Sequence, residues 1–123
     1  MERSGSPQDG LRRRGRERAG ACLYSPPMDL GELQATMRET YLERDAARGR
    51  DATFRWLTEE VGELARALRT DDRENLVHEF GDVLAWLTSL ANLQDVDLAA
   101  AVARYADGCP KCGGRPCACE PST

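Results

Sequence analysis

The sequence lacks several patterns that would place the protein in other classes. It has no apolar run of about 18 residues, which a membrane-spanning helix needs, and no basic segment leading into an apolar one, which a signal peptide needs. It also has no alternating apolar and polar stretch that would predict a β-strand. A chain of 123 residues has room for one domain with a modest core. We therefore expect an all-α protein in the cytoplasm, with no membrane partner.

The chain is acidic overall, with a formal charge of −4, but its charge changes along its length. Residues 1–27 hold six arginines and three acidic residues (+3), are rich in Gly, Ser and Pro, and show almost no apolar periodicity. This composition predicts a disordered basic tail. From residue 28 onward, 11 basic and 18 acidic residues give −7, which argues against a nucleic-acid surface.

Apolar residues recur at helical spacing after residue 28 and predict four helices, which form an all-α bundle over residues 28–107. Asp residues stand where N-caps are expected. The expected helices are 29–47 capped by Asp29, one from Asp51, one opened by a capping box of Asp71 with Glu74, and Leu98 to about Ala106 capped by Asp97.

The two central helices each carry an apolar arc that is predicted to face the core. The arcs consist of Phe54, Leu57, Val61, Leu64 and Leu68 on one helix, and Leu76, Val77, Phe80, Val83, Leu84, Leu87 and Ala91 on the next. A bundle of about 80 residues has a thin core, so we expect a second subunit.

Beside its apolar arc, each central helix carries two carboxylates three residues apart: Glu60 with Glu63, and Glu79 with Asp82. Residues at this spacing project from one stripe of a helix. Four carboxylates that meet repel one another unless a cation lies among them, and Mg²⁺ prefers such oxygen ligands. A di-iron bundle would need Glu-x-x-His pairs, for which the only histidine, His78, is wrongly placed. The pattern therefore favours magnesium.

At these residues the chain resembles a known family. The segment from Trp56 to Ala65, followed by the segment from Glu79 to Leu84, resembles the E-E-x-x-E and E-x-x-D signature of the MazG-like nucleoside triphosphate pyrophosphohydrolases. The resemblance spans about residues 28–105 and implies Mg²⁺-dependent cleavage of a nucleoside triphosphate to the monophosphate and pyrophosphate, by a homodimer or homotetramer. The catalytic residues that it implies are Glu59, Glu60, Glu63, Glu79 and Asp82, the last four as Mg²⁺ ligands.

Two tryptophans, Trp56 and Trp86, share the flanks that carry the carboxylates. They are either aromatic residues at the edge of the core or a surface on which a nucleobase stacks. The resemblance implies base binding for Trp86, because relatives carry an aromatic residue four positions after the final Asp. Both are candidate substrate-binding residues.

Four of the five cysteines lie within eleven residues, as a C-x2-C-x4-C-x-C array of Cys109, Cys112, Cys117 and Cys119. Four thiolates this close suit a closed tetrahedral Zn²⁺ site, so residues 108–123 are interpreted as a metal-binding tail. A redox or disulfide pair is the alternative. The fifth, Cys22, has no assigned role.

Two other functions stay open at this point. In a non-catalytic helical adaptor, the acids would be surface charge and the cysteine array an interaction knuckle; such a protein would be indifferent to Mg²⁺, whereas an enzyme would be stabilised by it. Nucleic-acid binding by the Arg-rich tail and the knuckle would show a steep salt dependence.

Overall fold

The computed structural model describes residues 27–121. These residues form α-helices and one short 3₁₀ helix, without any strand, and this confirms the all-α prediction. The elements are α2 (Leu30–Arg48), α3 (Arg50–Thr70), α4 (Arg73–Leu93), α5 (Leu98–Val102) and the 3₁₀ helix η1 (Ala103–Tyr105). The basic tail expected over residues 1–27 lies outside the described residues except at Pro27, and so does Cys22.

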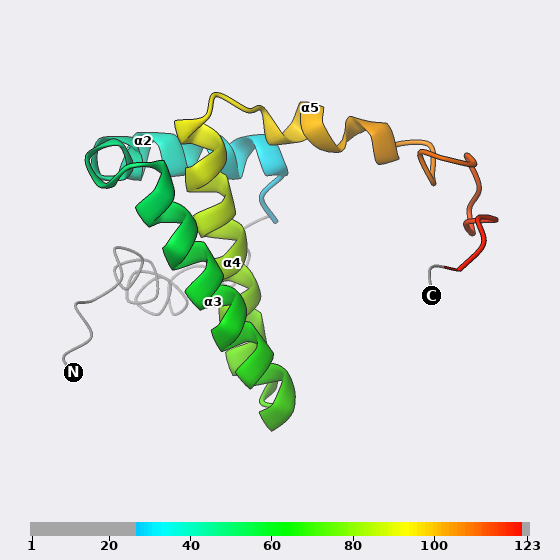
Figure 1. Ribbon diagram of the computed structural model, residues 1–123, viewed down its shortest axis with the longest axis horizontal. Coiled ribbons are helices and arrows are strands. Elements are labelled where there is room, and N and C mark those ends of the chain that lie inside the picture. Colours follow the sequence, from blue (N-terminus) through cyan, green and yellow to red (C-terminus); the bar gives the residue numbers. More distant parts are fainter. Residues whose placement is uncertain (1–26, 122–123) are drawn as a thin grey trace.

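The helices α3 and α4 lie side by side as an antiparallel hairpin, and α2 crosses the end of the hairpin where α3 begins and α4 ends (Figure 1). A small core forms where Met37 and Tyr41 of α2 meet Ala85 of α4. The helix α5 and the cysteine-rich segment after it extend away from the hairpin (Figure 1). Within the described part of the chain, no helix is long and apolar enough to cross a membrane. The cytoplasmic location stays a prediction.

The junction between α2 and α3 is a single residue, Gly49, with φ +90°. An L-residue with a Cβ rarely adopts this φ, whereas glycine does so readily, and this allows the chain to turn within one residue. Gly49 therefore holds the N-cap position of α3, and its carbonyl accepts a hydrogen bond from Thr53 Oγ1 at 2.7 Å. The prediction that Asp51 caps this helix is wrong, because Asp51 lies within the first turn.

The other expected caps are partly correct. Asp29 caps α2, as predicted, and its Oδ1 accepts a hydrogen bond from the Glu32 N–H at 2.8 Å. The predicted capping box of Asp71 with Glu74 is wrong, since Asp72 caps α4 while Asp71 adopts a left-handed conformation that ends α3. The sequence offers two adjacent aspartates here, and the turn between the helices uses both.

Gln34 of α2 fixes where α5 begins. Its Oε1 accepts a hydrogen bond from the Leu98 N–H at 2.9 Å, and its Nε2 donates to the Val96 carbonyl at 2.7 Å. Asp97 caps α5 as predicted, but the α-helix ends at Val102 and continues only as the 3₁₀ turn η1. The single helix expected to reach Ala106 is therefore shorter than predicted.

The apolar arcs predicted for the core are largely on the surface, which corrects the sequence-based assignment. Phe54 of α3 is 56% exposed and Phe80 of α4 is 58% exposed, whereas Leu57 and Leu76 are buried as expected. The reason is that α2 packs on another side of the hairpin and leaves this one open. We call the exposed residues the apolar face; they are Phe54, Val61, Leu68, Val77, Phe80, Leu84 and Leu87.

Candidate functional site

Three carboxylates from α3 and α4 come together in the interior of the hairpin. Glu60 of α3 and Glu79 and Asp82 of α4 each place one oxygen within 4.8 Å of the other two. All three residues are buried, with only 3–4% of their surface exposed. The spacing of three puts Glu79 and Asp82 on one stripe of α4, and the packing of the hairpin brings Glu60 opposite that stripe. The structure thus joins three of the four residues predicted as Mg²⁺ ligands.

The other two candidate acids lie near this group without belonging to it. Glu63 follows Glu60 on α3 and is partly exposed. Glu59 is exposed and lines a hollow of about 300 Å³, together with Ala52, Arg55 and Trp56. Glu59 therefore borders the indole of Trp56.

The two tryptophans form a stack. Their ring centroids are 5.9 Å apart and their planes are 12° from parallel. Trp86 is fully buried, whereas Trp56 is partly exposed. The guanidinium of Arg48 lies over the Trp86 ring, 4.8 Å from its centroid. A ligand that reaches this stack from solvent meets Trp56, and Trp86 with Arg48 supports that ring from within.

Arg48 is held in this position by Asp45 and Thr53, which the sequence did not single out. Arg48 Nη1 donates to Asp45 Oδ1 at 3.0 Å and to Thr53 Oγ1 at 3.3 Å. Asp45 is only 2% exposed. In the sequence, an Asp and an Arg three residues apart at the end of a helix resemble ordinary surface charges. The sequence feature that could have marked them is their position just before Gly49, where one helix ends and the next begins in a new direction.

The carboxylate group has the chemistry of a site for a hard divalent cation. Three oxygens this close, taken out of water, repel one another, and a cation among them offsets that repulsion. All donors are carboxylates, without thiol or imidazole, and such sets suit Mg²⁺ better than softer transition metals. The residues present therefore fit a magnesium ion, beside an indole stack that is suited to a planar ring.

A second group of metal-binding side chains lies beyond η1. The sulfur atoms of Cys109, Cys112, Cys117 and Cys119 all lie within 4.8 Å of one another, so the structure brings together every thiol of the predicted zinc site. The four thiols are free, without a disulfide among them. The separations of Cys109 Sγ from Cys119 Sγ and of Cys112 Sγ from Cys117 Sγ are both 3.8 Å.

Local hydrogen bonds shift the acidity of these thiols in opposite directions. The backbone N–H groups of Ala118 and Gly114, which donate to the sulfur, lower the pKa of Cys112 to about 6. Contacts with neighbouring thiols, that of Cys117 first, raise the pKa of Cys119 to about 11. A thiolate at Cys112 is therefore favoured by the backbone around it, which is a property of metal-binding cysteines.

Comparison with known proteins gives a family for this arrangement. Residues 48–112 match the family model of the MazG nucleotide pyrophosphohydrolase domain. The matched interval covers more than half of the chain and includes all of α3 and α4, with the carboxylate group and both tryptophans. No curated protein matches the chain significantly. On the family match and the site that it spans, the chain belongs to the MazG nucleotide pyrophosphohydrolase domain family.

Proposed function

We propose that this protein is a Mg²⁺-dependent hydrolase that cleaves nucleoside triphosphates to the monophosphate and pyrophosphate. The observation that carries the proposal is the buried group of Glu60, Glu79 and Asp82. Membership of the family supports the class of reaction. In a helical adaptor these acids would be solvated surface charges, and their burial within the hairpin speaks against that alternative.

Glu60, Glu79 and Asp82 would hold the cation through one oxygen each, with Glu63 as a further ligand. When bound, Mg²⁺ supplies positive charge between an acidic site and a polyanionic substrate and stabilises the leaving pyrophosphate. Glu59 is the candidate for orienting the attacking water, because its exposed carboxylate can accept a proton from it. The water would attack the α-phosphorus, the bond from that phosphorus to the α,β-bridging oxygen would break, and pyrophosphate would leave.

The base of the nucleotide would stack on Trp56, which is partly exposed beside the hollow that Glu59 borders. Trp86 would contribute from behind, since its ring supports that of Trp56. Stacking on an indole tolerates any base, because every base has a π-face. The indole pair therefore supports binding of a nucleotide without selecting which one.

The decisive test is pyrophosphate release from a panel of normal and modified nucleoside triphosphates in the presence of Mg²⁺. We expect release by the wild type and its loss in both Glu63→Gln and Asp82→Asn. Glu43→Gln, at an exposed position of α2, is the matched control and should retain activity. If folded protein with its metal sites loaded releases no pyrophosphate from any triphosphate, the helical adaptor becomes the better assignment.

We also propose that the active form is a homodimer or homotetramer assembled through the apolar face. On α3, Phe54, Val61 and Leu68 follow one another at intervals of seven, and on α4, Phe80 and Leu87 have the same spacing. A seven-residue repeat of exposed apolar side chains is typical of helices that pack against partner helices. A second hairpin related by a two-fold axis would cover the face and complete a four-helix arrangement.

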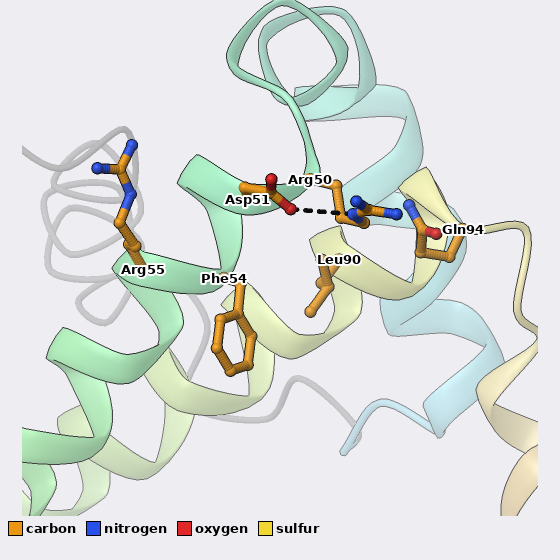
Figure 2. A pocket seen from close by; sticks show the side chains of 6 residues that line it. All are labelled: Arg50, Asp51, Phe54, Arg55, Leu90 and Gln94. Atoms are coloured by element: carbon orange, nitrogen blue, oxygen red, sulfur yellow. Dashed lines mark hydrogen bonds and ion pairs between the residues drawn. The ribbon is translucent and has the colours of Figure 1, made fainter.

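One end of the apolar face is hollowed. Figure 2 shows the ring of Phe54 from α3 and the side chain of Leu90 from α4 beside the same hollow, which has a volume of about 410 Å³. Arg50 Nε donates to Asp51 Oδ1 at 3.0 Å along its rim. An apolar centre with charged residues around it is typical of a protein interface. This composition supports the proposal that the partner chain fills the hollow.

We further propose the domain limits given by the sequence, with residues 28–107 as the catalytic domain and residues 108–123 as a metal-binding tail. The family match ends at residue 112, within the cysteine array. The tail is therefore a feature of this chain that the family match covers only in part.

A further inference from the structure

The cysteine-rich segment takes no part in the reaction proposed above. We propose that Cys109, Cys112, Cys117 and Cys119 bind one Zn²⁺ ion, and that this ion folds residues 108–119 into a knuckle that is structurally separate from the carboxylate site. The proposal rests on the geometry of the sulfur atoms, the backbone around them and the absence of an apolar core in this segment. It does not depend on the hydrolase activity.

The sulfur positions match those of a metal-bound set. In a tetrahedral site, zinc lies about 2.3 Å from each sulfur, so that neighbouring sulfurs are about 3.8 Å apart. Two independent pairs, Cys109 with Cys119 and Cys112 with Cys117, have this separation of 3.8 Å. A disulfide would bring two sulfurs to about 2.05 Å. The four thiols are thus placed for coordination of a common ion.

The backbone is wrapped around the sulfurs with its N–H groups pointing toward them. The Gly114 and Ala118 N–H groups donate to Cys112 Sγ at 3.4 and 3.3 Å, and the Cys119 N–H donates to Cys117 Sγ at 3.3 Å. Donors of this kind stabilise the negative charge of a thiolate and orient it toward the metal.

Glycines make these turns possible. Gly113 has φ +71°, in the left-handed region, and its N–H donates to the Cys109 carbonyl at 2.7 Å. At Gly114 a Cβ atom would lie 2.7 Å from the Pro116 carbonyl oxygen, closer than real Cβ contacts. The segment is therefore folded tightly on itself at positions that larger residues would obstruct.

Nothing apolar holds this tight fold together. Within residues 108–119, no residue is buried; Gly108, Cys109 and Gly114 are partly exposed, and the others are exposed. Ordering a chain without burying apolar surface is unfavourable, because the loss of conformational entropy is not offset. Metal coordination is the interaction that can supply the missing free energy, as it does in small zinc domains.

The charges in the segment also suit a zinc–thiolate complex. One Zn²⁺ with four thiolates carries a net charge of about −2. Lys111 and Arg115, both within the array, offset that charge. Arg115 also donates a hydrogen bond to the Ala106 carbonyl, which joins the knuckle to the end of η1.

The two metal sites of the chain differ in place and in chemistry. The knuckle lies beyond α5, away from the α3–α4 hairpin that carries Glu60, Glu79 and Asp82 (Figure 1). Thiolate ligands select zinc, whereas carboxylates suit magnesium. Loss of the ion from one site should therefore leave the other able to bind its own.

The test is the metal content of the full chain, purified under reducing conditions without a chelator and measured by elemental analysis. We expect about one zinc per chain, and Co²⁺ in its place should give the thiolate charge-transfer and intense visible bands of a tetrahedral site. Cys112→Ser and Cys119→Ser should lower the zinc content by at least about tenfold. Circular dichroism should show that the helices of both variants remain intact.

Two control variants test whether the zinc is bound by these four cysteines and not elsewhere in the chain. Cys22→Ser removes a thiol outside the array and should keep the zinc, and Asp82→Asn should keep it even if all hydrolase activity is lost. The proposal is overturned if the reduced wild type takes up neither Zn²⁺ nor Co²⁺, or if Cys112→Ser and Cys119→Ser retain full zinc. Two disulfides found by mass spectrometry in protein purified without added oxidant or reductant would also overturn it.

Discussion

The ring of Trp56 lies parallel to that of Trp86, 5.9 Å away, and only Trp56 is accessible from solvent. If the stack binds a nucleobase, Trp56→Ala should raise KM for the triphosphate about tenfold with a smaller effect on kcat, because base stacking on an aromatic side chain contributes about 1–3 kcal/mol. Steady-state kinetics of pyrophosphate release measures both constants. Trp56→Phe, which keeps a ring, should recover most of the affinity; a KM in Trp56→Ala equal to that of the wild type would exclude base stacking at this position.

The carboxylate group predicts a stabilising effect of Mg²⁺ that can be measured without substrate. At about 100 times its Kd, a ligand that binds only the folded state contributes about 2.7 kcal/mol, which corresponds to about 10 °C in Tm for a domain of this size. We expect this shift in the wild type and in Glu43→Gln, and its absence in Asp82→Asn. Thermal unfolding followed by circular dichroism makes the comparison. Equal shifts in Asp82→Asn and the wild type would place the ion elsewhere.

The ion pair of Arg48 with Asp45 should matter for stability. Asp45 is 2% exposed, so Arg48→Ala leaves a buried carboxylate without its partner and should lower the free energy of unfolding by about 3–5 kcal/mol. Urea denaturation gives this value. The matched control is Arg38→Ala, since Arg38 pairs with Asp95 at 3.7 Å on the surface, and its loss should change stability by less than about 1 kcal/mol. Similar effects of the two substitutions on the free energy of unfolding would contradict a stabilising role of the buried Arg48–Asp45 pair.

The apolar face predicts a specific effect on assembly. Phe80→Glu places a charge at the middle of the face and should weaken the association of two chains by about 30-fold or more, as expected for a residue central to an interface. Analytical ultracentrifugation over a range of protein concentrations measures the dissociation constant of the assembly. Val96→Glu is the control, because Val96 is similarly apolar and 44% exposed but lies in the turn between α4 and α5. A wild type that stays monomeric at high concentration would refute the proposed assembly.

The zinc knuckle predicts protection from proteolysis. Lys111 is an exposed site for trypsin within the array, and cleavage after it requires the surrounding turns to open. We expect cleavage at Lys111 to be at least about tenfold faster after zinc is removed by a chelator than in the zinc-loaded protein. Mass spectrometry of the fragments identifies the site. Cys112→Ser with zinc present should be cleaved as fast as the chelated wild type, and equal rates in all samples would mean that zinc does not order this segment.

Much of the candidate site could be predicted from the sequence because it depends on local spacing. Two carboxylates three residues apart share a helix stripe wherever the helix packs, and four cysteines within eleven residues must lie close together. These are the groups that the structure assembles, with Glu63 outside the carboxylate group. The residues that were missed, Asp45 and Arg48, owe their place to how α2 meets α3 and α4, and their position before Gly49 was the local sign of it.

The fold was predicted less completely, for a related reason. Apolar periodicity tells which side of a helix avoids water but not which chain covers it, and so Phe54 and Phe80 were assigned to the core although they are exposed in the single chain. Conversely, Thr88 and Ser89 are fully buried in α4, although no pattern in the sequence assigned them to the core. The start of α4 differs by one residue, because of the two adjacent aspartates Asp72 is the N-cap and Asp71 ends α3.

The single-residue junction at Gly49 limits how this chain can vary in length. A residue added or removed there has no loop in which to be absorbed, so it would change the direction in which α3 leaves α2. Arg48 at the end of α2 would then move off the Trp86 ring and lose its hydrogen bond to Thr53 of α3. Insertions and deletions should therefore be excluded between α2 and α3 in functional variants, whereas the segment after η1 can change in length without disturbing the hairpin.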